Sequence, residues 1–274
     1  MSRVAFHAQQ TAGALRAPIM GAMSGRGTSS LATRGVRMTR IALHLVRGVL
    51  TVAVMFPFLD VQGRRSTVKR WSYSLLRILG VHLHLHGEPP IRPTEPVMLV
   101  ANHVSWLDIF AINAVVPVRF VAKSEVRRWP VIGWLSAQSG TLFIERAQRR
   151  DTARINQLVA EVMLAGDVAA VFPEGTTTDG SQVLRFHSSL LQPALLAAAG
   201  LQPVALRFEH GDGSLCVEAA YDGDKSLWDT FRSIVAQPEI HAQVWFLPAL
   251  TARAGHRREL ADAAQAAIAD RLKS

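Results

Sequence analysis

The chain has 274 residues, of which 49% are apolar and only 19% are charged, and this composition excludes a chain that is disordered throughout. Cys216 is the only cysteine in the sequence, so an intramolecular disulfide scaffold is excluded as well. The formal net charge is +9, but residues 1–87 hold 12 basic residues against Asp60 alone, whereas residues 88–274 hold 18 basic and 20 acidic residues. The first third therefore carries +11 and the remainder −2, a distribution that suits docking on a membrane surface and gives no reason to expect a nucleic-acid partner.

Residues 1–37 have the composition of a tail, because they mix Ser, Thr, Gly, Ala and Arg without an acidic residue or a sustained apolar period. An Arg-rich, acid-poor start also occurs in organellar transit peptides, but nothing in this stretch resembles a cleavage site. We therefore predict a disordered leader or an over-long gene start, with Met23 or Met38 as the true first residue.

Residues 38–80 are predicted to form a membrane-associated helical segment. The stretch 41–59 is mostly apolar, and nineteen helical residues span roughly the 30 Å hydrocarbon thickness of a bilayer. Its strongly polar residues are His44 and Arg47, and Arg47 lies near enough to one end to reach the headgroups. A second helix over 64–79 places an apolar stripe with a tryptophan beside Arg and Lys, the composition of an interfacial helix. The alternative for 41–59 is a buried core helix, and the alternative for 64–79 is an amphipathic helix with a solvated basic face.

Residues 81–274 have the pattern of an α/β catalytic domain. Strand-like apolar runs alternate with helical periods, and several runs are continuously apolar, which indicates a mostly parallel central sheet flanked by helices. The strands are predicted at 81–86, 97–101, 119–122, 141–145, 168–172, 204–208, 215–219 and 242–247. The helices are predicted at 105–115, 131–137, 153–164, 190–199, 226–235 and 258–272.

Common motifs for phosphate, nucleophile and metal chemistry are missing from the sequence, including GxxxxGK[ST], GxGxxG, GxSxG, HExxH and the usual Cys/His zinc spacings. His82, His84 and His86 would share one face of a strand, and three imidazoles on one face can bind a metal. Without a carboxylate beside them, we expect a solvated or half-buried histidine face, and we predict neither a metal site nor a cofactor.

The segment 102–108 carries the strongest chemical signal, because it follows the apolar run 97–101 at the carboxyl end of a predicted strand, where open α/β sheets bind ligands. His103 is suited to general-base work, and a carboxylate on its other ring nitrogen would fix the tautomer. Asp108 can supply that carboxylate only if His103 precedes a helix and folds back over its first turn, with Ser105 as the N-cap. A capping box is the alternative use of the Asp108 carboxylate.

Four ordered blocks over about residues 80–210 contain these residues and resemble the glycerolipid acyltransferase family, whose bacterial members include PlsC-like lysophosphatidic acid acyltransferases. HxxxxD alone is common by chance, whereas the ordered set is specific. The blocks are NHxxxxD (Asn102, His103, Asp108), GxxFIxR (140–146), FPEGT (172–176) and a short apolar-proline block (203–204).

The resemblance implies an enzyme that moves a fatty acyl group from acyl-CoA or acyl-carrier protein to the hydroxyl of lysophosphatidic acid, giving phosphatidic acid in phospholipid biosynthesis. His103 would be the general base and Asp108 its orienting carboxylate. Basic residues would meet a phosphate, and a carboxylate would accept from a glycerol hydroxyl. The residues expected to bind substrate are Asn102, Lys123, Arg146, Glu174, Gly175 and Thr176.

One position departs from the family pattern, which usually continues as FPEGTR, because this chain has Thr177 where the arginine would stand. A hydroxyl does not replace the charge and the bidentate geometry of a guanidinium, so either Arg185 supplies the charge or the acceptor is another lysolipid, such as lyso-ornithine lipid. The expected location is the cytoplasmic face of the bacterial inner membrane. A non-catalytic membrane-binding protein on the same fold and an acyl-thioester hydrolase are the alternatives from other classes.

Overall fold

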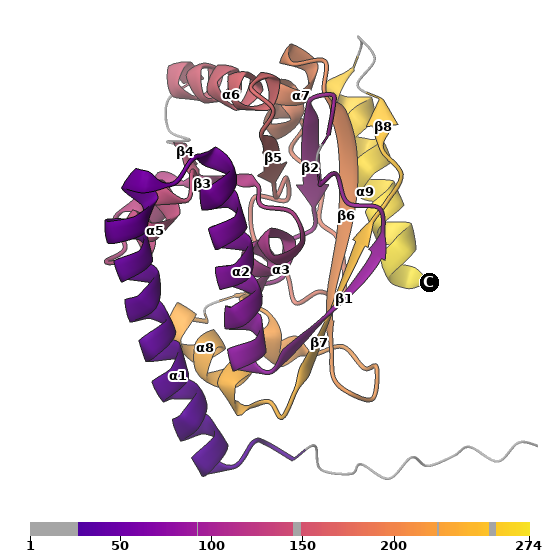
Figure 1. The fold of residues 1–274 in the computed structure, drawn as a ribbon. Helices are drawn as coiled ribbons and strands as arrows, with labels where there is room; N and C mark the ends of the chain where they lie inside the picture. Colours follow the sequence, from indigo (N-terminus) through magenta and orange to yellow (C-terminus); the bar gives the residue numbers. More distant parts are fainter. Residues whose placement is uncertain (1–26, 92, 145–148, 224, 252–255) are drawn as a thin grey trace, which may run out of the picture.

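The structure, a computed structural model, describes residues 27–91, 93–144, 149–223, 225–251 and 256–274. Within these residues an eight-stranded sheet lies between two layers of helices (Figure 1). The strands are β1 Val81–Gly87, β2 Val97–Ala101, β3 Arg119–Lys123, β4 Leu142–Ile144, β5 Val168–Val171, β6 Gly200–Glu209, β7 Ile240–Phe246 and β8 Leu250–Thr251. The α-helices are α1 Leu31–Leu50, α2 Val61–Leu79, α3 Leu107–Val115, α4 Ser124–Arg127, α5 Ile132–Gln138, α6 Arg149–Leu164, α7 Gln192–Leu196, α8 Leu227–Ala236 and α9 Arg257–Lys273. Short π- and 3-10-helical turns are η1 Thr51–Met55, η2 Phe56–Phe58, η3 Ser188–Leu191 and η4 Val217–Ala219.

The sheet is mostly parallel, as predicted. Its strand order is β1-β7-β6-β2-β5-β3-β4, and β8 pairs with β6. β6 runs antiparallel to β7 and β8, whereas the other pairings within the described sheet are parallel. Because parallel strands bring their carboxyl ends to one edge, the residues that follow β2, β3 and β5 lie at the same edge.

Alternate side chains of β2 face two different cores, and this explains its uninterrupted apolar sequence. Met98 and Val100 pack with residues of α6, α7 and α9 on one face of the sheet. Leu99 and Ala101 pack with residues of α3 on the other face. Helices therefore cover both faces, which confirms the predicted α/β class (Figure 1).

The N-terminal segment is a helical hairpin. α1 begins at Leu31 behind the N-cap Ser30, so helix starts within the stretch that the sequence assigned to the leader. The helical run continues through η1 and η2 to Phe58. These 28 residues form the one helix in the described part of the chain that is long and apolar enough to cross a membrane, by length and composition.

The second helix of the hairpin belongs to the core of the catalytic domain. Its buried side chains Leu75, Leu76 and Leu79 share a cluster with residues of α3, α8 and β7. α2 begins at the N-cap Asp60 and ends at Gly80, which adopts the left-handed conformation that stops a helix. The predicted boundary at residue 80 is thus a change of secondary structure within one packed unit.

The run 215–219, predicted as a strand, follows a turn at 211–213 and ends in η4. The chain reverses after His210, whose carbonyl accepts from the N–H of Gly213 at 2.9 Å. Cys216 then bonds back to β6, its N–H donating to the carbonyl of Phe208 at 2.9 Å. The reversal leaves too few residues for a paired strand, and Leu215 forms only an isolated bridge.

The predicted helix 190–199 is also shorter in the structure. It consists of η3 and α7, and α7 ends at Leu196. Gly200, the residue after the predicted helix, begins β6, and its N–H donates to the carbonyl of Pro96.

Candidate active site

Asn102 joins the end of β2 to β6 through its side chain. Its Nδ2 donates to the carbonyl of Leu206 at 2.9 Å, and its Oδ1 accepts from the N–H of Leu206 at 2.8 Å. The side chain is buried, and both ends of the amide are occupied. Asn102 therefore fixes the point from which the next residue leaves the sheet, and its predicted role in binding substrate stays a prediction.

His103 and Asp108 lie in contact, as the sequence predicted. The distance between His103 Nδ1 and Asp108 Oδ2 is 2.7 Å, and the carboxylate is fully buried whereas 20% of the imidazole is exposed. The ring stacks on Phe172, with centroids 4.0 Å apart and planes at 10°. The imidazole is thus held on one side by a carboxylate and on one face by an aromatic ring.

The Asp108 carboxylate combines the two uses that the sequence left open. The same Oδ2 atom also accepts from the N–H groups of Val104 at 2.8 Å and Ser105 at 2.9 Å. The helix begins at Leu107, and among the described residues Ser105 Oγ has no hydrogen-bond partner, so the prediction of Ser105 as a side-chain cap is wrong. Because backbone donors hold the carboxylate as an acceptor, the neutral His103 ring carries its proton on Nδ1 and leaves Nε2 unprotonated.

Glu174 fixes the backbone of His103. Its Oε1 accepts from the N–H of His103 at 2.7 Å, and its Oε2 accepts from the N–H of Leu184 at 2.8 Å. Only 4% of the residue is exposed, and burial raises the pKa of its carboxyl to about 7 although both N–H bonds oppose the rise. Each oxygen accepts one backbone N–H, so Glu174 supports the backbone of the site, and its predicted contact with a substrate hydroxyl stays a prediction.

Two further hydrogen bonds hold the turn after β5, and one of them joins it to His103. The N–H of Thr178 donates to the carbonyl of His103 at 2.9 Å, and the Oγ1 of Thr177 donates to the carbonyl of Tyr221. Gly175 has a φ of 75°, in the region that favours glycine, so this tight turn explains the glycine of the block. Thr176 is exposed, so its side chain stays available to a ligand, as its predicted role requires.

The predicted cations are distributed around this edge of the sheet. Lys123 ends β3 and is exposed. Arg185 is exposed in a segment that lies along the turn, because its neighbour Leu184 bonds to Glu174. The predicted phosphate ligand Arg146 lies outside the described residues.

Two contributions to the site escaped the sequence analysis. Phe172 stacks on His103, and Phe120 in turn stacks on Phe172 with centroids 5.6 Å apart. Thr178 holds the His103 carbonyl through its backbone. The aromatic residue at the start of the FPEGT block was the available signal for the first, whereas a backbone contact leaves no signal in the sequence.

The fold and the site define an α/β enzyme with a His–Asp dyad at the carboxyl edge of its sheet. Residues 82–207 match the protein-family model described as Acyltransferase. The chain is 37% identical over 213 residues to the lyso-ornithine lipid O-acyltransferase of Pseudomonas aeruginosa, covering 77% of this chain and 81% of that protein. It is 36% identical over 186 residues to the 1-acyl-sn-glycerol-3-phosphate acyltransferase of Neisseria meningitidis, covering 68% and 72% of the two chains.

The crystal structure of PlsC, the 1-acyl-sn-glycerophosphate acyltransferase of Thermotoga maritima, has a similar fold, with a TM-score of 0.62. The sequence identity is 19%, and the similarity covers 86% of this chain and 96% of that one. The chain belongs to the PlsC-like acyltransferase family, as its sequence blocks indicated, and it is an acyltransferase.

Proposed function

We propose that the enzyme transfers a fatty acyl group from an acyl thioester, acyl-CoA or acyl-carrier protein, to the hydroxyl of a lysolipid, with His103 as the general base. The observation that carries this proposal is the buried Asp108 carboxylate 2.7 Å from His103 Nδ1, in a site where the ring remains partly exposed. No bonding partner of His103 Nε2 occurs among the residues that the structure describes. That atom is therefore available to a substrate hydroxyl.

The proposed reaction needs no covalent acyl-enzyme. Nε2 takes the proton of the lysolipid hydroxyl while its oxygen forms a bond to the thioester carbonyl carbon. The carbon–sulfur bond of the tetrahedral intermediate then breaks, and the leaving thiolate takes the proton back from Nε2. Asp108 remains ionised and stabilises the imidazolium between the two steps. The mechanism uses neither a metal nor a redox cofactor.

The test is acyl transfer by the variant His103→Ala, measured with radiolabelled acyl-CoA and lysolipid. Loss of a general base lowers the rate by about 10²–10⁴-fold. Circular dichroism verifies that the variant folds, and the surface variant His256→Ala is the matched control. Transfer at close to the wild-type rate would exclude His103 as the base, and release of free fatty acid without lysolipid product would indicate a hydrolase.

Lysophosphatidic acid is the acceptor that the family implies, and lyso-ornithine lipid is a second candidate that one observation favours. Thr177 has no positive charge, and its hydroxyl donates to the carbonyl of Tyr221, so its side chain has no charge and no free donor for a phosphate. The P. aeruginosa relative is named for lyso-ornithine lipid and the N. meningitidis relative for 1-acylglycerol 3-phosphate. Parallel assays with the two lysolipids as acceptors distinguish these candidates by the ratio of their kcat/KM values.

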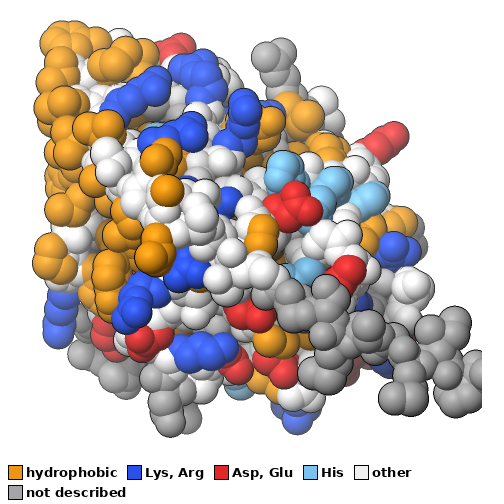
Figure 2. Space-filling model, turned by 90° about the horizontal axis from the view of Figure 1, so that it is seen from below, with side chains coloured by type: hydrophobic (Ala, Val, Ile, Leu, Met, Phe, Trp, Pro, Cys, Tyr) orange, Lys and Arg blue, Asp and Glu red, His pale blue; other side chains and the backbone are white. Residues whose placement is uncertain are grey.

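We also propose that α1 attaches the enzyme to the cytoplasmic face of the inner membrane, where its lysolipid resides. Large apolar side chains are exposed along this helix and the turns after it, namely Leu43, Val46, Leu50, Val54, Met55 and Phe58. Figure 2 shows hydrophobic side chains along its left edge, the side on which α1 lies in Figure 1, with Lys and Arg side chains next to them. This combination is typical of a surface that contacts anionic lipid.

A further inference from the structure

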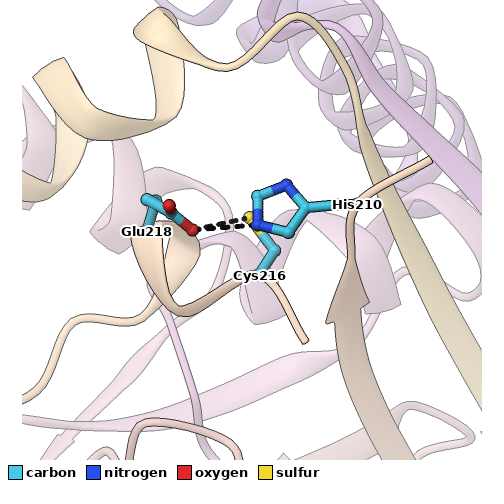
Figure 3. Close-up of side chains that lie close together, drawn as sticks. All are labelled: His210, Cys216 and Glu218. Atoms are coloured by element: carbon cyan, nitrogen blue, oxygen red, sulfur yellow. Dashed lines mark hydrogen bonds and ion pairs between the residues drawn. The ribbon is translucent and has the colours of Figure 1, made fainter. Parts of the chain in front are cut away.

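A second cluster of reactive side chains lies where β6 runs past the edge of the sheet. His210 follows β6, Cys216 follows the turn, and Glu218 lies in η4 (Figure 3). The distance from His210 Nε2 to Glu218 Oε2 is 3.1 Å, and that from Cys216 Sγ to the same oxygen is 3.7 Å. All three potential ligand atoms lie within 4.8 Å of one another.

The two separations from Glu218 Oε2 are close to those between ligands around one small cation. A tetrahedral zinc ion, with bonds of about 2.0–2.3 Å, separates nitrogen from oxygen by about 3.3 Å and sulfur from oxygen by about 3.5 Å. The observed distances of 3.1 and 3.7 Å differ little from these values. A thiolate, an imidazole and one carboxylate are ligands that zinc accepts, whereas Mg²⁺ and Ca²⁺ require sites made of oxygen.

The burial of the cluster also suits a protein metal site. Cys216 and His210 are only 1% and 8% exposed, whereas the Glu218 side chain is 36% exposed. Two ligands are therefore fixed by the packed interior, and the third faces the solvent from which a cation enters. Such an arrangement leaves the fourth tetrahedral position for a water molecule.

We propose that His210, Cys216 and Glu218 bind one zinc ion, with water as the fourth ligand. On binding, the Cys216 thiol releases its proton to solvent and the thiolate bonds to Zn²⁺, while His210, neutral with its proton on Nδ1, bonds through the lone pair of Nε2; both residues exchange their hydrogen bonds to Glu218 for bonds to the metal. The spacing of the three residues matches none of the usual zinc motifs, which is why the sequence analysis predicted no metal. The cluster exists only because the turn after β6 folds Cys216 and η4 back beside His210.

The proposed zinc site is connected to the catalytic turn through Tyr221. The segment that it closes leads from η4 directly to Tyr221, whose N–H donates to the carbonyl of Val104 at 2.9 Å. The Tyr221 carbonyl in turn accepts from Thr177. A zinc ion that pins η4 would therefore stabilise both backbone segments that hold His103.

The histidine face predicted from the sequence is a weaker candidate, because a third ligand atom does not join the pair His84 Nε2 and His241 Nδ1, 2.9 Å apart, among the described residues. Within the described part of the chain, only the cluster around Cys216 brings three such ligand atoms within 4.8 Å. These histidines provide the matched control, because His84→Ala removes a surface imidazole without touching the proposed site.

The test measures metal binding by the full-length protein in detergent after removal of metals with a chelator. We expect one Zn²⁺ per chain by elemental analysis, and a thiolate-to-metal charge-transfer absorption when Co²⁺ is bound instead. The variants Cys216→Ser and Glu218→Gln should lose the absorption or bind Zn²⁺ at least about tenfold more weakly, whereas His84→Ala should bind as the wild type does. Added Zn²⁺ should raise the Tm of the wild type and of His84→Ala, but not that of Glu218→Gln.

Two results would overturn the proposal. The first is a wild-type protein that folds and transfers acyl groups but retains no Zn²⁺ in the presence of excess Zn²⁺. The second is Zn²⁺ binding that persists in Glu218→Gln and Cys216→Ser and disappears in His84→Ala, which would assign the metal to the face of β1 and β7. Neither result bears on His103 as the base, because acyl transfer is measured separately.

Discussion

His103 owes its proton-accepting nitrogen to Asp108, and the variant Asp108→Asn tests this dependence. Asparagine is nearly the same size, but its amide can donate to His103 Nδ1 and then stabilises the wrong tautomer, with the proton on Nε2. We expect kcat to fall by about 10³–10⁴-fold with a much smaller change in KM. Steady-state acyl transfer measures both constants. A kcat within a few-fold of the wild-type value would mean that the contact of 2.7 Å has no role in proton transfer.

Glu174 gives the stability of the protein a pH dependence that Glu174→Gln should remove. Its folded-state pKa of about 7 lies above the ordinary 4.5, so the folded protein holds a proton that the unfolded chain releases. The wild type should therefore be most stable, relative to the variant, below about pH 4.5, and should lose this advantage as the pH rises to about 7. Since tenfold in proton affinity is about 1.4 kcal/mol, the change is roughly 3 kcal/mol.

Urea unfolding of both proteins at several pH values between 4.5 and 8 provides the measurement. The variant also lacks one of the two carboxylate oxygens, so one N–H group, of His103 or Leu184, loses its acceptor at every pH. The cost of the lost hydrogen bond is the same at every pH, whereas the cost of ionising Glu174 in the wild type grows as the pH rises. Stability curves that stay parallel from pH 4.5 to 8 would contradict the raised pKa.

Sequence reasoning located the dyad but did not predict the hydrogen bonds that support it. The contact between His103 and Asp108 is local, and the geometry of one helical turn was enough to predict it. Asn102 and Glu174 were assigned to the substrate, yet their polar atoms bond to backbone groups of Leu206, His103 and Leu184. A motif specifies residue types, and it does not reveal which distant N–H groups the fold brings to them.

At the scale of elements, the crossing of α1 and α2 depends on a glycine. A Cβ atom at Gly48 would lie 2.7 Å from Nε1 of Trp71, and that indole is held by a hydrogen bond to the carbonyl of His44. Gly48→Ala should therefore destabilise the protein by about 1–3 kcal/mol, in spite of the better helix propensity of alanine. The fall in Tm, expected to be several degrees, is the measurement.

A matched control lies in the same helix. Nothing lies within 4 Å of a Cβ built at Gly35, which is exposed in α1. Gly35→Ala should therefore leave stability unchanged or raise it by about 0.5–1 kcal/mol. Equal effects of the two substitutions would show that the close approach of Trp71 does not limit the packing of the hairpin.

Sequence reasoning predicted best those elements whose apolar pattern is fixed by burial on one or both faces. β2 and α2 were placed correctly because burial on one or both faces dictates their periodicity. The run 215–219 was misassigned because its apolar residues fill a turn against β6, and periodicity does not separate a short buried strand from a buried turn. The early start of α1 followed from the Ser30 cap rather than from an apolar pattern.

At the scale of the whole molecule, the cations of α2 have two roles. Some form ion pairs and hydrogen bonds within the protein, and others face the solvent. Arg65 pairs with Asp167, which also pairs with Arg119 at 2.6 Å. The Nε of Arg64 donates to the carbonyls of Phe56 and Leu59 in the turn between the two helices. Arg64 thus closes the turn of the hairpin and Arg65 ties α2 to the residues before β5, so their charge is not simply available to lipid.

The remaining cations of α2 should provide most of its attraction to lipid. Arg70 and Arg77 are exposed, and Lys69 has no salt-bridge partner among the described residues. Since a cation near an anionic bilayer contributes about 1 kcal/mol, the triple variant Lys69→Gln, Arg70→Gln, Arg77→Gln should bind anionic vesicles about 100-fold more weakly at low salt. High salt should narrow the difference from the wild type, and binding to zwitterionic vesicles, which depends on the apolar face of α1, should be the same for both.

Arg65→Gln is the informative comparison: it removes one positive charge from the same helix, but it should lower the Tm by breaking the pair with Asp167. Vesicle flotation and thermal unfolding of all three proteins separate the two roles. If the triple variant floats with anionic vesicles as well as the wild type does, the positive charge of α2 is a solvated face and α1 alone attaches the enzyme.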